Sequence, residues 1–150
     1  MRILRIVLLI LLIVVVMITV GGFLIFNDTT RGPLPVLNGT LNVTGLQAQV
    51  EILRDDWGVP NIYASNTHDL FFAQGFTQAQ DRWWQMEFSR HVGNGAIQEL
   101  TGKTISLIGT DVFIRTVGWR QAAERDFAQF SEQERVMLQT FSDGVNAYIT

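Results

Sequence analysis

Hydrophobic side chains are concentrated at the start of this chain. From Ile6 to Phe26 no charged residue occurs, and only one threonine and two glycines interrupt a run of aliphatic and aromatic residues. A helix over this range rises roughly 31 Å, which is enough to cross a hydrocarbon core of about 30 Å. The pattern therefore predicts a single N-terminal transmembrane helix, or a signal segment, over residues 1–26.

A retained membrane anchor and a cleaved signal peptide both fit this segment. The apolar core of a signal peptide is usually about 7–15 residues long and is followed by a small-residue cleavage site. The run here is longer, and residues 23–28 contain no such site, which favours an anchor. Arg2 and Arg5 precede the run, so the positive-inside tendency places residues 27 onward outside the cytoplasm. Secretion after cleavage remains the alternative.

Residues 27–45 differ in composition from the segments on both sides. They are rich in Asn, Asp, Thr, Gly and Pro, which is typical of an extended linker. From residue 46 the spacing of apolar residues becomes that of a folded protein. We therefore divide the chain into an N-terminal segment at 1–26, a linker at 27–45 and the beginning of a folded domain at 46–150.

The folded part opens with the pattern of a β-hairpin. Apolar and polar residues alternate over residues 49–52, as in a half-buried strand. Residues 55–58 (Asp-Asp-Trp-Gly) predict a turn, because Gly58 can adopt the positive φ that many hairpin connections need. Residues 59–64 then form the returning strand. Pro60 cannot donate to a sheet ladder, so we expect it at an edge or a bulge.

A long amphipathic helix follows the hairpin. Asn66 or Thr67 can cap it, and Asp69 suits the positive end of the helix dipole. Its predicted buried stripe, spaced by four and three residues, consists of Phe72, Phe76, Ala79, Trp83 and Met86. Gly75 costs about 1 kcal/mol relative to alanine inside a helix, so we expect another backbone to pack close to it. The Gly-Asn-Gly sequence at 93–95 ends the helix.

Three more helical segments are predicted after this helix. The first is a short turn at 96–101 that stops at Gly102, and the second covers residues 111–130 with apolar positions at Phe113, Val117, Ala123 and Phe127. The third opens with a capping box at 131–134 and has apolar positions at Val136, Leu138, Phe141, Val145 and Tyr148. No Gly or Pro follows its last apolar position, so we expect the fold to continue past Thr150. Strands followed by helices predict an α+β fold.

Charge and composition exclude some functions. Setting aside Arg2 and Arg5, the remaining 9 of 11 basic residues face 14 acidic ones, a net charge of −5 for residues 27–150. This acidity argues against a nucleic-acid-binding protein, which would present a basic patch. The chain has no cysteine, so it has neither a disulfide framework nor a thiolate nucleophile or metal ligand.

No residue of the chain is predicted to be catalytic, cofactor-binding or metal-binding. His68 is interpreted as a surface or capping residue at a helix start, and His91 as the helical partner of Glu87 four residues before it. The metal-binding patterns H-x-x-x-H and H-E-x-x-H are absent, as are G-x-S-x-G and the glycine-rich phosphate loops. The three tryptophans in this region, Trp57, Trp83 and Trp84, are interpreted as core or inter-subunit packing.

A string of polar residues on the long helix invites an acid–base interpretation, which helical geometry weakens. The string consists of Gln78, Gln80, Asp81, Arg82, Gln85, Glu87 and Arg90. Asp81 is four residues from Gln85, and Gln78 is four residues from Arg82, so each pair can form along one helix face. Glu87 can reach Arg90 at a spacing of three. The string is therefore interpreted as a solvated or interface-facing flank of the helix.

Six sequence motifs occur in order between Val50 and the end of the chain. They are Arg54-Asp55-x-Trp57-Gly58-Val59-Pro60-x-Ile62-Tyr63-Ala64, Asp69-Leu70-Phe71-Phe72-Ala73-Gln74-Gly75-Phe76, Ala79-Gln80-Asp81-Arg82-x-Trp84-Gln85-Met86-Glu87, Gly95-x-Ile97-x-Glu99-Leu100-x-Gly102, Arg115-Thr116-x-Gly118 and Gly144-Val145-Asn146-Ala147-Tyr148. Each motif alone is weak, but the series is specific. Together they resemble the opening of the penicillin acylase (penicillin amidase) family, whose precursors mature into N-terminal-nucleophile hydrolases.

The resemblance implies a mechanism and a fold. Family precursors cut themselves into an α and a β chain, and the new N-terminal serine of the β chain attacks a linear amide bond, with its own α-amino group as base. The implied fold is a four-layer αββα sandwich, and a calcium ion bridges the chains in many members. The serines of this chain, Ser65, Ser89, Ser106, Ser131 and Ser142, do not lie at a matching processing site. We therefore expect no cofactor site here, and calcium only in the full-length enzyme.

These observations predict the N-terminal portion of a membrane-anchored, exported amidase zymogen. Its expected partners are the β-chain portion of the same precursor, a small N-acyl amide substrate and, through residues 6–26, the membrane, with no nucleic acid among them. A β-lactam side-chain amide, an acyl-homoserine lactone and other N-acyl compounds all fall within the implied range of substrates. The fragment alone should be inactive. The alternative is a membrane-anchored, non-enzymatic binding module.

Overall fold

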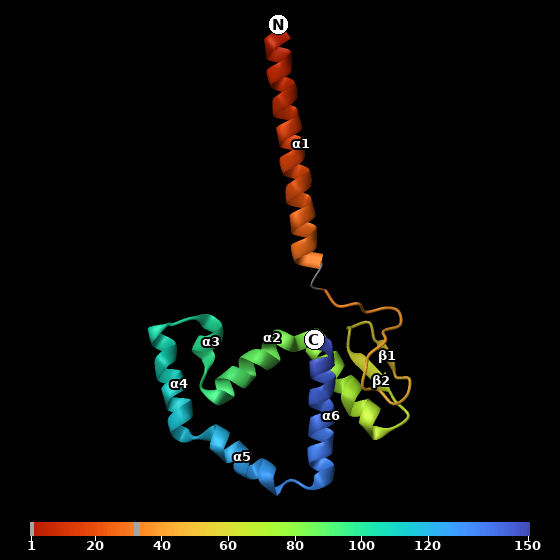
Figure 1. The fold of residues 1–150 in the computed structure, drawn as a ribbon, viewed down its shortest axis with the longest axis vertical. Helices are drawn as coiled ribbons and strands as arrows, with labels where there is room; N and C mark the ends of the chain where they lie inside the picture. The colour runs from red at the N-terminus through yellow and green to blue at the C-terminus, as the bar shows by residue number, and fades with distance from the viewer. Residues whose placement is uncertain (1, 32–33) are drawn as a thin grey trace. The chain divides into compact units, whose positions relative to one another are not determined.

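The computed structural model describes residues 2–31 and 34–150, which divide into two compact units, 1–40 and 41–150 (Figure 1). Met1, Gly32 and Pro33, which belong to the predicted N-terminal segment and linker, lie outside the described residues. The first unit is built on α1 (Arg2–Arg31). Residues 27–31, which were predicted to begin the linker, are helical and extend α1 to Arg31.

Helix α1 is long and apolar enough to cross a membrane. The qualifying span is Arg5–Arg31, and the described side chains of its apolar stretch are not buried against the protein. A signal sequence near an N-terminus meets the same criteria of length and composition. The structure thus contains one apolar N-terminal helix of the kind that the sequence predicts, without separating an anchor from a signal.

The second unit begins with the predicted hairpin. Strand β1 (Glu51–Arg54) pairs antiparallel with β2 (Pro60–Tyr63), with Glu51 opposite Tyr63 and Arg54 opposite Pro60. Gly58 adopts a φ of 77°, as the turn requires. Pro60 opens the second strand of this two-stranded sheet, in keeping with the expected edge position. The predicted half-burial of the first strand is wrong within this chain, because three of the four residues of β1 are exposed.

Helix α2 (Thr67–Asn94) is the long helix expected after the hairpin. The Asn66 side chain accepts a hydrogen bond from the Asp69 N–H at its start, and Gly95 in the left-handed conformation ends it. At Arg82 the backbone departs from helical geometry, with φ −142° and ψ 25°, and the helix is kinked there. Of the predicted stripe, Phe72 and Ala79 are buried, and Phe76, Trp83 and Met86 are half-buried. Burial is therefore strongest before the kink.

The core of the unit is the contact between α2 and α6 (Glu132–Ile149). The predicted capping box opens α6, because Ser131 and Glu134 each bond the other's backbone N–H. A Cβ on Gly75 would lie 3.1 Å from the Val145 backbone nitrogen, and a Cβ on Gly144 would lie 3.0 Å from the Phe76 backbone nitrogen. The expected close approach at Gly75 is confirmed, and Gly144 is its counterpart on α6.

Three helices connect α2 to α6. Helix α3 (Ile97–Thr101) is the predicted short turn, followed by α4 (Ile105–Val117) and α5 (Trp119–Gln129). They leave the end of α2 and return to the start of α6 (Figure 1). The single helix predicted over residues 111–130 is wrong. Gly118 adopts a φ of 79° and its N–H bonds the Ile114 carbonyl, which ends α4 and separates it from α5.

The glycines between α2 and α6 generate the first prediction. Replacing Gly75 or Gly144 with alanine should lower the free energy of unfolding by about 3 kcal/mol, because the added methyl group meets backbone atoms that cannot move aside as a side chain can. Urea unfolding of the purified protein, followed by circular dichroism, measures this change. Gly93→Ala is the control, since nothing lies within 4 Å of a Cβ there. Equal stability of the Gly75 and Gly93 variants would contradict the prediction.

Candidate functional site

A fully buried carboxylate lies at the start of α2. Asp69 Oδ1 accepts a hydrogen bond from the Gln47 N–H at 2.9 Å, and Oδ2 accepts from the Ala48 N–H at 2.8 Å and from Asn66 Nδ2 at 2.7 Å. His68 Nδ1 lies 3.0 Å from Oδ1. Asp69 therefore attaches the segment before the hairpin to the first turn of α2, a larger role than the helix-dipole contact expected from the sequence.

The environment of Asp69 keeps this carboxylate ionised. Burial raises its pKa, but hydrogen bonds from the Gln47 backbone and from His68, Asn66 and Ala48 outweigh burial and lower the pKa to about 2. The predicted surface or capping position of His68 is confirmed, since its half-exposed ring sits in the first turn and pairs with Asp69. The hydrogen bonds to this carboxylate are structural, and every partner comes from the chain itself.

A second polar cluster joins the hairpin to α2. The Arg54 guanidinium donates to both carboxylate oxygens of Asp81, at 2.9 and 2.8 Å, and also to Gln80 Oε1 and the Gly58 carbonyl, both at 2.9 Å. The predicted Asp81–Gln85 pair is therefore wrong. The reason is tertiary: a bidentate guanidinium arriving from the hairpin binds the carboxylate more strongly than a neighbouring amide does. Arg82 instead donates to Gln85, at 3.3 Å.

The last turns of α2 contain the predicted ion pairs. Arg90 donates to both oxygens of Glu87, at 2.8 and 2.7 Å, and this hydrogen bonding lowers the pKa of Glu87. The predicted pairing of His91 with Glu87 is also confirmed, with Nδ1 3.4 Å from the carboxylate and 2.9 Å from the Glu87 carbonyl oxygen. The His91 ring is buried, and its Nε2 lies 3.7 Å from Glu99 on α3.

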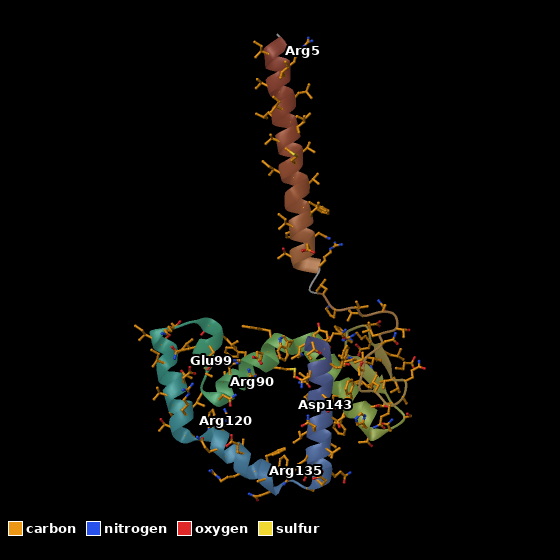
Figure 2. The ribbon with its side chains drawn as sticks, in the orientation of Figure 1. Arg5, Arg90, Glu99, Arg120, Arg135 and Asp143 are labelled. Carbon is orange, nitrogen blue, oxygen red and sulfur yellow. The ribbon has the colours of Figure 1, made fainter. Side chains whose placement is uncertain are left out.

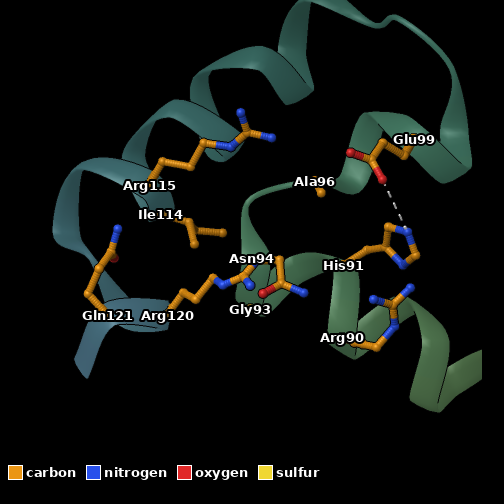
Figure 3. Close-up of a pocket in the computed structure, with 10 residues that line it drawn as sticks. All are labelled: Arg90, His91, Gly93, Asn94, Ala96, Glu99, Ile114, Arg115, Arg120 and Gln121. Atoms are coloured by element: carbon orange, nitrogen blue, oxygen red, sulfur yellow. Dashed lines mark ion pairs between the residues drawn. The ribbon is translucent and has the colours of Figure 1, made fainter. Parts of the chain in front are cut away.

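A cavity of about 360 Å³ lies where the end of α2 meets α3, α4 and α5 (Figure 3). Its lining consists of Arg90, His91, Gly93, Asn94, Ala96, Glu99, Ile114, Arg115, Arg120 and Gln121. Figure 2 labels Arg90, Glu99 and Arg120, which lie on α2, α3 and α5. Its three arginines already have partners within the chain: Arg115 donates to the Gly95 carbonyl at 2.7 Å, Arg120 to Glu124 at 3.0 Å and Arg90 to Glu87.

Asp111 supports this cavity from α4. Its buried carboxylate accepts hydrogen bonds from the Ile97 and Gln98 backbone N–H groups, at 3.0 and 3.3 Å, and so holds the first turn of α3 against α4. Burial raises the pKa of Asp111, but the hydrogen bonds from Ile97 and Gln98 outweigh burial and bring the pKa below its ordinary value. The charge of Arg115 makes a smaller contribution in the same direction. Sequence reasoning missed this carboxylate because its partners are 13 and 14 residues away and leave no periodic pattern.

The cavity lining presents no hydroxyl nucleophile of the kind used in amide hydrolysis. That chemistry needs a nucleophile within hydrogen-bond reach of a base, with donors placed for the oxyanion. The lining contains no serine, threonine, lysine or tyrosine. Two of the serines have local roles instead: Ser131 caps α6, and the Ser142 hydroxyl donates to the Leu138 carbonyl. Among residues 2–31 and 34–150, no three His, Asp or Glu side chains gather as a metal site would require.

Two of the tryptophans lie on the surface of the folded unit. The Trp57 side chain, at the tip of the hairpin turn, is 91% exposed, and Trp84 is 63% exposed, whereas Trp83 is half-buried. Core packing within this chain is therefore the wrong interpretation for Trp57 and Trp84. The turn itself is well braced, because Asp55 Oδ1 accepts from the N–H groups of Trp57 and Val59 at 2.9 and 2.8 Å.

Comparisons with known proteins identify relatives of the chain over the same elements. Residues 49–150 match the family model described as penicillin amidase. The chain is 36% identical over 122 residues to penicillin acylase 2 proenzyme from Pseudomonas sp. (strain SE83), covering 81% of the chain and 16% of that protein. It is 37% identical over 102 residues to penicillin G acylase from Escherichia coli, covering 68% of the chain and 12% of that protein.

Two further matches are an acylase that is named for a different substrate and a solved acylase structure. The chain is 34% identical over 123 residues to the acyl-homoserine lactone acylase QuiP from Pseudomonas aeruginosa, covering 82% of the chain and 14% of that protein. A thermostable penicillin G acylase from Alcaligenes faecalis superposes with a TM-score of 0.60 at 30% identity, over 67% of this chain and 53% of that one. The chain thus spans less than a fifth of the length of these curated relatives.

The low pKa of Asp69 generates the second prediction. Because the folded-state pKa, about 2, lies below the ordinary value of 3.8, the stabilisation by Asp69 is complete above pH 3.8 and is lost as the pH falls through about 2. Asp69→Asn should lower the free energy of unfolding at pH 7 by about 2 kcal/mol, since its amide nitrogen would face a backbone N–H.

Chemical denaturation at a series of pH values measures the effect of Asp69. The wild type should lose stability between pH 4 and pH 2 more steeply than Asp69→Asn does. Asp126→Asn on the exposed surface of α5 is the matched control and should behave as the wild type. Parallel pH profiles of wild type and Asp69→Asn would refute the role assigned to this carboxylate.

Proposed function

The chain belongs to the penicillin amidase family, and from this membership we propose that it is the N-terminal portion of an amidohydrolase precursor. The proposed reaction is hydrolysis of the linear amide bond of an N-acyl compound. The observation that carries the proposal is the family match over residues 49–150, which runs from the hairpin through α6. The relatives include a penicillin acylase and an acyl-homoserine lactone acylase, two enzymes named for different substrates.

The proposed mechanism places the reacting groups in another part of the precursor. An N-terminal serine, released by self-cleavage, attacks the amide carbonyl while its own α-amino group accepts the proton through a water. Hydrogen-bond donors hold the oxyanion, and water then hydrolyses the acyl-enzyme. The name proenzyme of one relative supports a precursor. The described residues are proposed as one part of an αββα sandwich, and the fragment alone as inactive.

This chain contributes scaffold to that mechanism. Asp69 and the Arg54–Asp81 pair hold the hairpin and the segment before it on α2, and the glycine contact holds α2 on α6. Calcium takes six to eight oxygen ligands. No cluster of three His, Asp or Glu side chains occurs among the described residues, and calcium is proposed only for the full-length enzyme.

The proposed location is the outer side of a membrane, with α1 as anchor. The exposed apolar side chains of α1 support the proposal, because lipid would cover them. Arg5 before the apolar span supports an N-terminus in the cytoplasm. Secretion after cleavage of a signal is the alternative that the test below separates from anchoring.

The test of the function uses the full-length precursor. Replacing the serine at the start of the proposed β chain with alanine should abolish both self-cleavage and hydrolysis of amides, because one hydroxyl serves both reactions. Mass spectrometry follows cleavage, and release of the free amine from penicillin G and from an N-acyl-homoserine lactone follows hydrolysis. Ser142→Ala, on the exposed side of α6, is the control and should retain both activities. Survival of both activities without the β-chain serine would overturn the mechanism.

The test of the location is the N-terminal sequence of the mature protein. An anchored protein should keep residues 1–26 and stay in the membrane fraction after an alkaline carbonate wash. The wash releases peripheral proteins but does not extract an apolar helix of roughly 30 Å from the bilayer. A mature N-terminus near Asn27, with the protein in the soluble fraction, would show instead that the segment is a cleaved signal.

A further inference from the structure

His91 is a buried titratable side chain that the proposed reaction does not use. It lies in the last turn of α2, and its side chain is only 8% exposed. Residues of this chain alone bury it, so its surroundings do not depend on any further segment. Histidine is the side chain whose charge ordinarily changes between about pH 5 and 8, and the end of a helix favours a cation. A proton gained or lost by His91 therefore changes the interactions at the end of α2.

A hydrogen bond to the main chain decides which ring nitrogen of His91 gains and loses the proton. Nδ1 lies 2.9 Å from the carbonyl oxygen of Glu87, one helical turn before it. A carbonyl oxygen can only accept, so Nδ1 carries a hydrogen in both the neutral and the charged ring. Proton uptake and release therefore take place at Nε2.

Nε2 faces a carboxylate of the next helix. It lies 3.7 Å from Glu99 Oε2 on α3, and Figure 3 shows the two side chains directed toward each other. A protonated Nε2 donates to this carboxylate and forms a charge-assisted bond between α2 and α3. Without the proton, two acceptors face each other, and Glu99, whose side chain is 70% exposed, is free to turn into water. The His91–Glu99 contact thus depends on one proton.

The other charged groups of α2 near His91 keep their charge while the ring titrates. The Glu87 carboxylate lies 3.4 Å from Nδ1 of His91. The hydrogen bonds from Arg90 lower the pKa of Glu87, and the charges of Arg90 and His91 lower it further. Glu87 therefore remains a carboxylate throughout the range in which a histidine changes charge.

The charged groups that α4 and α5 contribute here also keep their charge. Arg115 on α4 and Arg120 on α5 line the same cavity as His91, and arginine stays protonated in proteins. Burial raises the pKa of Asp111 on α4, but its hydrogen bonds from the Ile97 and Gln98 N–H groups outweigh burial and lower the pKa. Among these neighbours of His91, none changes charge as the ring does.

Asp111 also limits how far a change at His91 can spread. It holds the first turn of α3 through the N–H groups of Ile97 and Gln98, and this attachment does not involve His91. Helix α3 has only five residues, and Glu99 lies in its middle. Loss of the His91–Glu99 contact should therefore loosen the second half of α3 and leave its start attached to α4.

We propose that His91 forms a pH-dependent contact between α2 and α3, in which the protonated ring holds Glu99 and loss of the Nε2 proton releases it. The contact is present at acidic pH and is lost as the pH rises through the titration of His91. The proposal goes beyond the amidase function and does not rest on it, because every group involved belongs to this chain.

Hydrogen–deuterium exchange of the full-length protein, followed by mass spectrometry at about pH 5.5 and about pH 8, tests the proposal. After correction for the intrinsic pH dependence of exchange, protection of the Glu99–Gly102 amides should fall about three- to fivefold at the higher pH, as expected for one partly exposed ion pair. Glu99→Gln keeps the size of the side chain but removes its charge, and should give the lower protection at both pH values. Glu124→Gln, on exposed α5, is the matched control and should behave as the wild type. Equal pH dependence in the wild type and Glu99→Gln would overturn the proposal.

Two substitutions of His91 separate a proton-dependent contact from a histidine that only fills space. His91→Arg keeps a charge at both pH values and should keep α3 protected at both, whereas His91→Gln should leave α3 less protected at both. Protection that still falls with pH in His91→Arg would contradict the proposal. Glu99 is largely exposed, so Glu99→Gln remains informative if a variant of the buried His91 fails to fold. Exchange requires no activity, so absence of amide hydrolysis would reject the proposed function alone.

Discussion

The close approach of α2 and α6 is the contact on which the described fold depends. Gly75 and Gly144 let the two backbones approach to a distance at which a methyl group on either would meet the main chain of the other helix. Phe72 and Ala79 on α2 and Val145 on α6 are buried at this junction, and the Phe76 and Tyr148 rings meet edge to face beside it. Helices α3, α4 and α5 connect these two helices, and α3 and α4 are held at the end of α2 by contacts of their own.

Carboxylate hydrogen bonds hold the parts of the unit that the α2–α6 contact does not include. The hairpin and the segment before it contribute few buried apolar side chains, so two carboxylates attach them to α2: Asp69 through the Gln47 and Ala48 N–H groups, and Asp81 through Arg54. Asp111 joins α3 to α4 in the same way. In each case a carboxylate accepts at least two hydrogen bonds, which for the buried Asp69 and Asp111 makes removal from water tolerable. Specific geometry here comes from charge-assisted hydrogen bonds more than from apolar area.

The same features explain how a family member can be recognised from residues that determine local structure and packing. The matched motifs coincide with turns, caps and packing positions: the Gly58 turn, the Arg54–Asp81 pair, Gly75, the Gly95 cap and Gly144. These residues hold a scaffold, and the chemistry proposed for the precursor needs groups from another part of it.

Local signals in the sequence determined the apolar N-terminal helix, the hairpin, the Asn66 and Ser131 caps, and the glycines that end α2 and α3. Each of these depends on residues within a few positions of one another, so periodicity and turn chemistry report them. The tertiary structure alone decided the burial of Asp69, the pairing of Asp81 with Arg54 instead of Gln85 and the role of Asp111. The break between α4 and α5 is local, because it depends on the left-handed Gly118 and its bond to Ile114, but the apolar pattern across it is continuous. The partners of the three carboxylates, in contrast, lie 13 to 27 residues away. Contacts at such separations arise only when the chain has folded back on itself, which is why local patterns could not predict them.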